Sequence, residues 1–403
     1  MCSSNTDATP SLLGYVYQIR YALLMAIKKG REVDDPDNCT VTIETIDDIS
    51  FEVNGDATDL IQTKHHMKEA NLTDKSSDIW RTIGNWSDKF NKNSHLIADE
   101  FVLALVTTSK KSDESLAQML SDDLDKRNEN KAYKALLKIA KNPGSKENEK
   151  DYYKFLELSD INQRRLVSSL YIITEAPHIQ VVPELLRKEL RTNISKPYME
   201  PFIERLEGKW FNWSIEVMSS NGTNSISIGD LITTIEQLAH EFSPNNLPAD
   251  YEDLIVDPFY ESQKSKHYVK QIELIEPSRR LINGAIRNCV RATAQRSKWS
   301  RENLLKPSEL KIYDKNLFEF WDEAMGIAES KSELKKFPVK LGVHVYEKCQ
   351  SDGLKAIRKL FNADYVAKGT YHILANQNKV GWHPDYEMLL AYKSSPILEE
   401  ENE

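Results

Sequence analysis

Apolar and polar residues alternate with two different periods near the start of the chain. Ser11–Lys29 carries apolar residues at intervals of three and four, which predicts a helix that Gly30 ends. Val41–Ile46 and Ile49–Val53 instead alternate with a period of two, which predicts two strands. The chain therefore opens with an amphipathic helix followed by two short strands.

The same patterns extend to about residue 110. The turn Asn54–Asp56 separates the second strand from a third, Asp59–Lys64. Asp78–Phe90 repeats aliphatic and aromatic residues at helical intervals. Phe101–Val106 is a short, continuous apolar run, as expected for a strand buried on both faces. We predict the order helix, three strands, helix, strand (αβββαβ), which is an α/β layout.

The middle of the chain has weaker patterns. Apolar spacing and turn residues favour four further elements and one charged loop. The predicted helices, strand and loop are Leu116–Ile139 (helix), Asn142–Lys150 (loop), Val167–Thr174 (strand), Val182–Leu190 (helix) and Ile228–Phe242 (helix).

A domain boundary is predicted after these elements. Ser243–Pro258 contains three prolines and few apolar residues, which is typical of a linker. Beyond it, Pro277–Arg296 and Leu310–Ile327 have helical spacing. We expect an α/β domain over residues 1–245, with helical elaboration, and a mainly helical module with a small mixed cap over residues 246–403.

Composition places the chain among soluble globular proteins. Hydrophobic residues make up 40% and charged residues 29%, and no apolar run approaches the roughly 20 residues that span a bilayer. The net charge of −9 does not exclude nucleic acid, because binding depends on where Lys and Arg lie. The N-terminus lacks the pattern of a signal peptide. The cysteines lie far apart, which argues against zinc and disulfides and suits a cytoplasmic protein: Cys2, Cys39, Cys289 and Cys349.

Polar side chains gather at the ends of two predicted strands. Gln62 and Lys64 are two residues apart, so their side chains share a face. Glu44 and Asp48 also share a face if the chain stays extended between them. Pairing of these strands would bring two carboxylates, an amide oxygen and an ammonium group together.

Such a group of side chains has a chemical use. Mg²⁺ prefers oxygen ligands and keeps several waters, so Asp48, Gln62 and Asp47 could bind it. A bound metal ion lowers the pKa of water and stabilises charge on a phosphate, while an ammonium such as that of Lys64 orients the attacking water. A carboxylate and a Gln-x-Lys pair also occur without function on the open face of a sheet. The preceding helix with Gln18 and the following helix and buried strand favour a site.

Three strings also resemble a known superfamily: GYVYQ (Gly14–Gln18), IETIDD (Ile43–Asp48) and IQTKHH (Ile61–His66). They are similar to the PD-(D/E)xK nuclease superfamily, and most of all to the double-stranded-DNA endonuclease domain of CBASS effector nucleases and Lamassu-type antiphage and antiplasmid systems. The resemblance implies a restriction-endonuclease-like fold for the N-terminal domain.

The resemblance also implies roles for single residues. Asp48 corresponds to the metal-binding aspartate and Lys64 to the catalytic lysine. Gln62 stands where most relatives have Glu, although Gln is common there in the Mrr-like branch, and Gln18 falls where many relatives carry a helix glutamate. These two replacements should weaken metal binding unless Glu44 or Asp47 compensates.

The C-terminal half resembles a second kind of module. The matching strings are RATAQRSKWSRENLL (Arg291–Leu305), ELKIYDKNLFEFW (Glu309–Trp321) and VGWHPDY (Val380–Tyr386). They look like the C-terminal module of effectors in three-component systems with an SMC-like ABC ATPase. The resemblance implies docking onto that ATPase and a small middle subunit, and a homo-oligomer when the effector is active.

Several other residues have two readings each. His65 and His66 could touch the scissile phosphate, or end a strand without a role. Three arginines at helical spacing form either a solvated face or a contact with DNA phosphates or an acidic partner: Arg280, Arg287 and Arg291. The spacing of His372, His383 and Asp385 fits no ligand set, so we expect structural roles. A GxxxxGK[ST] loop is absent, so any ATPase is a partner.

The polar residues at the strand ends predict a metal-dependent hydrolase, and the resemblance implies that it cuts double-stranded DNA with Mg²⁺ or Mn²⁺ as the effector of a bacterial defence complex. The alternative is a scaffold subunit that keeps the nuclease fold without activity. A third possibility is cleavage of RNA by the same residues.

Overall fold

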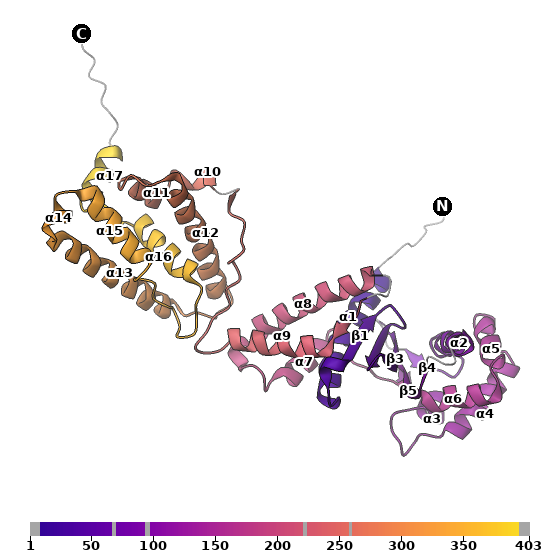
Figure 1. Cartoon of the computed structure of the whole chain (residues 1–403). Helices are drawn as coiled ribbons and strands as arrows, with labels where there is room; N and C mark the ends of the chain where they lie inside the picture. Colours follow the sequence, from indigo (N-terminus) through magenta and orange to yellow (C-terminus); the bar gives the residue numbers. More distant parts are fainter. Residues whose placement is uncertain (1–8, 67–69, 93–96, 221–223, 258–259, 395–403) are drawn as a thin grey trace, which may run out of the picture. The chain divides into compact units, whose positions relative to one another are not determined.

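The computed structural model describes residues 9–66, 70–92, 97–220, 224–257 and 260–394 (Figure 1). The chain divides into two compact units, Met1–Ala239 and His240–Glu403. The structure divides between residues 239 and 240, whereas the linker composition predicted a boundary between residues 245 and 246. Among these residues, no helix combines the length and the apolar character needed to cross a bilayer.

Unit 1 is built on a six-stranded sheet in the order β7-β5-β3-β2-β1-β8. The first three strands, β1 (Cys39–Ile43), β2 (Ile49–Val53) and β3 (Asp56–Lys64), form an antiparallel meander. Beyond β3 the sheet becomes parallel, through β5 (Ile97–Thr107) and β7 (Leu170–Ile173). Three short strands complete the unit. Strand β8 (Ile226–Ser227) pairs with β1 at the edge of the sheet, and β4 (Asn71–Leu72) pairs with β6 (Lys110–Lys111) in a separate two-stranded ladder.

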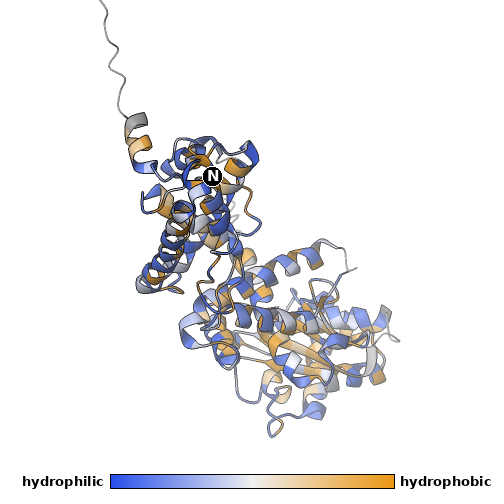
Figure 2. Cartoon of the chain, turned by 60° about the vertical axis from the view of Figure 1, so that its left-hand side comes forward, coloured by the Kyte–Doolittle hydropathy of each residue, from blue (hydrophilic) through white to orange (hydrophobic). Residues whose placement is uncertain are grey.

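Helices cover both faces of this sheet (Figure 1). One group is α1 (Thr9–Glu32), α7 (Val182–Leu190), α8 (Met199–Ser219) and α9 (Ile228–Glu241). The other group is α2 (Ser77–Lys92), α3 (Leu116–Met119), α4 (Glu129–Lys141), α5 (Glu149–Leu156) and α6 (Asp160–Ser169). In Figure 2 the strands are largely orange, which marks them as the hydrophobic centre of the unit.

The strand face that looks toward α2 forms the larger core. Leu60 of β3 and Leu103 and Leu105 of β5 pack there with the fully buried Trp80 and Trp86 of α2. Because side chains alternate along a strand, Gln62 and Lys64 follow Leu60 on this same face. The core thus decides which side of β3 carries these polar residues.

The first helix runs past the residue predicted to end it. Gly30 lies inside α1, which continues to Glu32. A Cβ at Gly30 would lie 3.0 Å from Ile228 and 3.2 Å from Ile232, both on α9. Gly30 therefore serves a close helix approach and not a C-terminal cap.

Other differences from the predicted elements arise where local chemistry overrides periodicity. The predicted helix Leu116–Ile139 is two helices, because the Asn128 side chain accepts from the Lys131 amide and begins α4 separately. The first part of the predicted strand Val167–Thr174 belongs to α6. Strand β1 ends at Ile43, before Glu44.

The regular elements in the described part of unit 2 are all helices, so the predicted mixed cap contains no strand there. Its helices are α10 (Tyr260–Gln263), α11 (His267–Glu273), α12 (Arg279–Arg301), α13 (Pro307–Ser330), α14 (Ser332–Lys335), α15 (Pro338–Gln350), α16 (Asp364–Asn376) and α17 (Tyr386–Ser394). Helices α12 and α16 approach closely at Gly369, where a Cβ would lie 2.1 Å from the Asn288 carbonyl oxygen. That distance leaves no room for any side chain.

This contact yields a stability prediction. Gly369→Ala should lower the free energy of unfolding of unit 2 by about 1–3 kcal/mol, because the new methyl group forces backbone apart in a packed core. The measurement is chemical denaturation of the full chain, followed by tryptophan fluorescence.

Gly326 is the matched control, since it is an exposed helical glycine of the same unit with open space at its Cβ position. Gly326→Ala should stabilise by up to about 1 kcal/mol through helix propensity. Equal effects of the two substitutions would show that α12 and α16 do not pack at Gly369.

Candidate functional site

Three strand ends meet at one edge of the unit 1 sheet. The register pairs Ile43 of β1 with Ile49 of β2, and Ile49 with Ile61 of β3. The residues just beyond these pairs, Glu44, Asp48 and Gln62, therefore lie at the same edge. The sheet register brings together the polar positions that the sequence singled out.

Asp48 is fixed against the end of β3. Its Oδ2 accepts hydrogen bonds from the backbone N–H of Thr63 at 2.8 Å and from the Thr63 hydroxyl at 3.3 Å. Its Oδ1 has no hydrogen-bond partner among the residues that the structure describes. One oxygen of this carboxylate thus holds the strands together and the other is available to a ligand.

Glu44 reaches the same place by a turn. The sequence had instead suggested an extended strand there, and that prediction was wrong. Its φ of 55° lies in the left-handed region, and its backbone N–H donates to the Asp48 carbonyl at 3.1 Å. A non-glycine residue held there carries local strain, which concentrates at functional sites. The turn places the Glu44 side chain beside Asp48.

The electrostatics of Glu44 show what surrounds it. Burial raises the pKa of the Glu44 carboxyl above its ordinary value, and repulsion from Asp48 and Asp47 adds to the rise. A hydrogen bond from Gln18 and the positive charge of Lys64 oppose it. Glu44 is therefore within electrostatic reach of the other charged residues of the predicted site.

Gln62 and Lys64 occupy the face of β3 that looks toward α2. The buried Gln62 side chain accepts a hydrogen bond from the Thr82 hydroxyl at 2.8 Å through Oε1. Lys64 is half-buried, and its side chain makes no hydrogen bond or ion pair within the described ranges. Its positive charge acts on Glu44, and without a fixed partner the ammonium group is free to contact a substrate.

Asp47 differs from the other predicted metal ligands. Its carboxylate is 1% exposed, and Oδ2 accepts from the Trp86 indole N–H and from Lys89 Nζ at 2.8 Å. Its Oδ1 accepts from the Asp48 backbone N–H at 3.2 Å. Both oxygens accept hydrogen bonds, and those to Oδ2 tie the turn to α2, although Asp47 also lines the cavity that Glu44 and Asp48 line. Glu44, whose carboxylate has fewer such contacts, is the better-placed ligand for a metal ion.

A cavity of about 370 Å³ opens between the 44–48 turn and α2. Its lining includes Glu44, Asp47, Asp48 and Gln62, together with Asn85, Asp88 and Lys89 of α2, and does not include Lys64. The contribution of α2 was not predicted from the sequence. A signal was present, because Thr82, Asn85 and Lys89 recur at helical spacing among the apolar residues of that helix.

The donor set fits a hard divalent cation. No three His, Cys, Asp or Glu side chains of the described chain form a metal cluster by themselves. Glu44 and Asp48 supply two carboxylates that repel each other, and the buried Gln18 Oε1 beside them has no hydrogen-bond partner within the described residues. Gln62 Oε1 keeps a second lone pair. Two carboxylates, amide oxygens and water suit Mg²⁺.

Helix α1 holds two strand ends through consecutive residues. Gln18 donates to Glu44 at the end of β1, whereas the ring of Tyr17 lies 4.7 Å from that of His65 at the end of β3. Burial, with the nearby His178 and His66, lowers the pKa of His65. His65 is thus packed against α1, while His66 Nε2 lies 2.6 Å from Asp78 Oδ2.

The residues of unit 2 that the sequence analysis named differ in exposure and in hydrogen bonding. Arg280 and Arg287 are exposed on α12, whereas Arg291 donates from Nε and Nη2 to the Leu254 carbonyl at 3.2 and 2.9 Å. His372 is fully buried, and burial lowers its pKa to about 3. His383 Nδ1 accepts from the Asp385 backbone N–H at 3.1 Å. Arg291 therefore stabilises the fold of this unit.

Comparisons with known proteins bear mainly on the second unit. Residues 268–390 match the family model for C-terminal domain 7 of the ABC-three component (ABC-3C) systems. No curated protein matches the chain. Among solved structures, a SAVED/CARF-domain containing receptor, Cap4 of Moraxella osloensis, aligns at 15% identity with a TM-score of 0.34. That alignment covers 68% of this chain and 60% of the receptor chain, and a TM-score this low does not establish a shared fold.

The environment of Glu44 gives a pH prediction. Because its pKa is raised in the folded state, the stability it contributes is present below the ordinary glutamate pKa of about 4.3 and is lost as pH rises through the folded value. Without divalent metal, Glu44→Gln should therefore unfold at a higher temperature than the wild type at pH 7, with the gap closing toward pH 4.

Thermal melts of both proteins in EDTA between pH 4 and pH 7 measure this gap. The acid end serves as an internal control, since the wild-type side chain is then also neutral. A wild-type protein that is more stable than the variant at pH 7 would contradict the raised pKa that burial and the charge of Asp48 give Glu44.

Proposed function

We propose that unit 1 is a metal-dependent endonuclease that cleaves double-stranded DNA, and that the chain is the effector of an ABC-three component defence complex. The observation that carries the proposal is the meeting of Glu44, Asp48, Gln62 and Lys64 at one sheet edge. Two carboxylates and an amide oxygen next to an unpaired ammonium are suited to phosphodiester hydrolysis.

The topology supports the same proposal. Apart from the two-residue strand β4 between β3 and α2, the chain order of α1, β1, β2, β3, α2 and β5 follows the predicted αβββαβ order, and its antiparallel meander continues into a parallel strand. This order favours a restriction-endonuclease-like domain. The candidate residues lie at the edge where β2 begins and β3 ends. Gln62 and Lys64 end β3, as the Gln-x-Lys motif requires.

Each residue has a distinct task in this mechanism. Glu44 and Asp48 hold Mg²⁺ or Mn²⁺, with the amide oxygens of Gln62 and Gln18 as further ligands. The metal ion, when bound, supplies Lewis acidity toward a phosphate oxygen and water. Lys64 orients the attacking water and neutralises charge on the scissile phosphate. Thr63 and Thr82 keep Asp48 and Gln62 in place.

The second unit supports a place in a larger assembly. The match of residues 268–390 to an ABC-three component domain favours docking onto the partners of such a system, an SMC-like ABC ATPase and a small middle subunit. A homo-oligomer in the active state follows from the resemblance to effector nucleases. The competing proposal is a scaffold in which the nuclease fold has no activity.

Plasmid cleavage separates the two proposals. With Mg²⁺ and high protein concentration, the wild type should cut plasmid DNA, and Lys64→Ala or Asp48→Asn should reduce the rate by a factor of about 10² or more, as loss of a group that stabilises the transition state does. Lys134→Ala is the matched control, since Lys134 is exposed on α4 far along the chain from the candidate site. Structured RNA as substrate tests the third possibility.

Metal binding gives a second readout that does not need activity. Mg²⁺ or Mn²⁺ should raise the melting temperature of the wild type, because a ligand that binds only the folded state stabilises it. The increase should be lost in Asp48→Asn and retained in Lys134→Ala. An absence of cleavage with any metal, partner or concentration would favour the scaffold.

A further inference from the structure

A second cavity lies wholly within unit 2. Its volume is about 640 Å³, within the range of small-molecule sites, and it is formed by Tyr251, Leu254, Gln263 and Lys266 together with residues of α11, α12 and α16. It shares no residue with the candidate nuclease site in unit 1. Nothing in the proposed DNA cleavage uses it.

The charge of its lining is one-sided. Lys266 and Arg301 contribute two cations, and no Asp or Glu belongs to the lining described for this cavity. Arg301 Nη1 donates to the Ser297 hydroxyl at 2.6 Å, and neither cation has an ion pair with a carboxylate in the part of the chain that is described. In a chain with a net charge of −9, two cations left without acidic partners in one cavity favour an anion.

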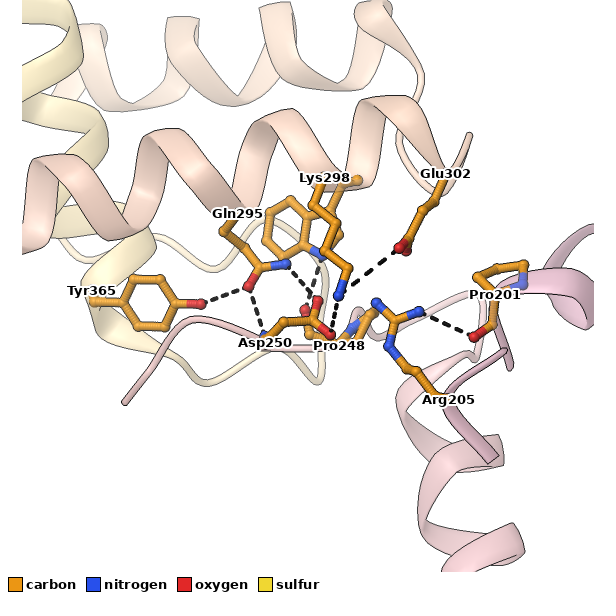
Figure 3. A network of polar contacts seen from close by, with 9 residues as sticks. Pro201, Arg205, Pro248, Asp250, Gln295, Lys298, Glu302 and Tyr365 are labelled. Atoms are coloured by element: carbon orange, nitrogen blue, oxygen red, sulfur yellow. Dashed lines mark hydrogen bonds and ion pairs between the residues drawn. The ribbon is translucent and has the colours of Figure 1, made fainter. Parts of the chain in front are cut away.

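Two nearby carboxylates form ion pairs with another cation, Lys298. Lys298 Nζ lies 2.8 Å from Asp250 Oδ1 and 3.9 Å from Glu302 Oε1 (Figure 3). The Gln295 amide fixes Asp250 further, because Nε2 donates to Asp250 Oδ2 at 3.0 Å and Oε1 accepts from the Asp250 backbone N–H at 2.7 Å. Asp250 and Glu302 thus have Lys298 as an ion-pair partner, whereas neither carboxylate has an ion pair with Lys266 or Arg301 within the described residues.

The rest of the lining is neutral and suits an organic group. Burial raises the pKa of the Cys289 thiol to about 11 and that of the Tyr268 phenol above its ordinary value, so both stay uncharged at neutral pH. Tyr251 offers a ring, and Asn376 and Gln377 offer amides that can donate and accept hydrogen bonds. Such groups recognise a flat, polar ring.

We propose that this cavity binds a small phosphorylated ligand with a planar ring, such as a nucleotide, through Lys266 and Arg301. The two cations contact the phosphate. The tyrosine ring and the amides contact the ring of the ligand. The site belongs to the unit that carries the ABC-three component match, so a ligand there acts on the second unit and not on the candidate nuclease residues.

Calorimetric titration of the full chain tests the proposal, with ADP, AMP, adenosine and pyrophosphate as probes. EDTA is present throughout, so that metal-mediated binding in unit 1 does not contribute. ADP and AMP should bind, and adenosine and pyrophosphate should each bind at least about tenfold more weakly, because each lacks one of the two recognised parts.

Two variants probe the site itself. Lys266→Ala with Arg301→Ala should weaken ADP binding by about tenfold or more, since each removes a charge-assisted contact. Ala294→Phe, which fills the cavity without changing charge, should weaken it as well. The matched control is Lys270→Ala with Arg279→Ala, which removes one exposed lysine from α11 and one exposed arginine from α12 outside the lining.

Melting temperatures of all variants show whether each is folded before it is titrated. Failure of every nucleotide to bind at millimolar concentration would overturn the proposal, and so would equal binding by the control and the Lys266/Arg301 variant. Binding of a glutamate-rich peptide without binding of nucleotides would also overturn it and would make the cavity a protein-docking groove. None of these outcomes depends on DNA cleavage.

Discussion

The hydrogen bond from the Thr63 backbone N–H to the Asp48 carboxylate is the contact on which the candidate site depends. It joins the residue just before β2 to the end of β3, beyond the last backbone pair between these two strands. A carboxylate that accepts a backbone hydrogen bond has a fixed orientation, so its second oxygen has a fixed direction. The positions of Glu44 and Gln62 matter for chemistry only because this bond fixes the edge between them.

Two helices support that edge from opposite faces of the sheet. On one face, Tyr17 and Gln18 of α1 contact the ends of β3 and β1. On the other, Thr82 of α2 holds Gln62, and two further residues of α2 hold the Asp47 carboxylate. The site residues are thus positioned by elements whose apolar faces form the core, and the packing of the core sets the geometry of the polar edge.

The sequence predicted most of unit 1 because its patterns are local. Alternation identified β2 and the face shared by Gln62 and Lys64, and helical spacing identified α2. The turn at Glu44 escaped prediction, because a left-handed glutamate has no signature in composition or period. The hydrogen bonds from α2 to the Asp47 carboxylate also could not be predicted, because they depend on how two distant segments pack. The helix end predicted at Gly30 was wrong for a related reason, since in the sequence a glycine needed for close helix packing cannot be told from a glycine that ends a helix.

The left-handed backbone at Glu44 has a consequence for the history of this protein. Glycine and asparagine adopt that conformation at lower cost than glutamate, so the present residue makes the turn less stable than it could be. Proteins commonly give up stability where activity requires an unfavourable residue. Laboratory evolution for heat resistance alone would replace this glutamate early and discard a carboxylate of the site, whereas lineages under selection for the carboxylate would keep the strained residue.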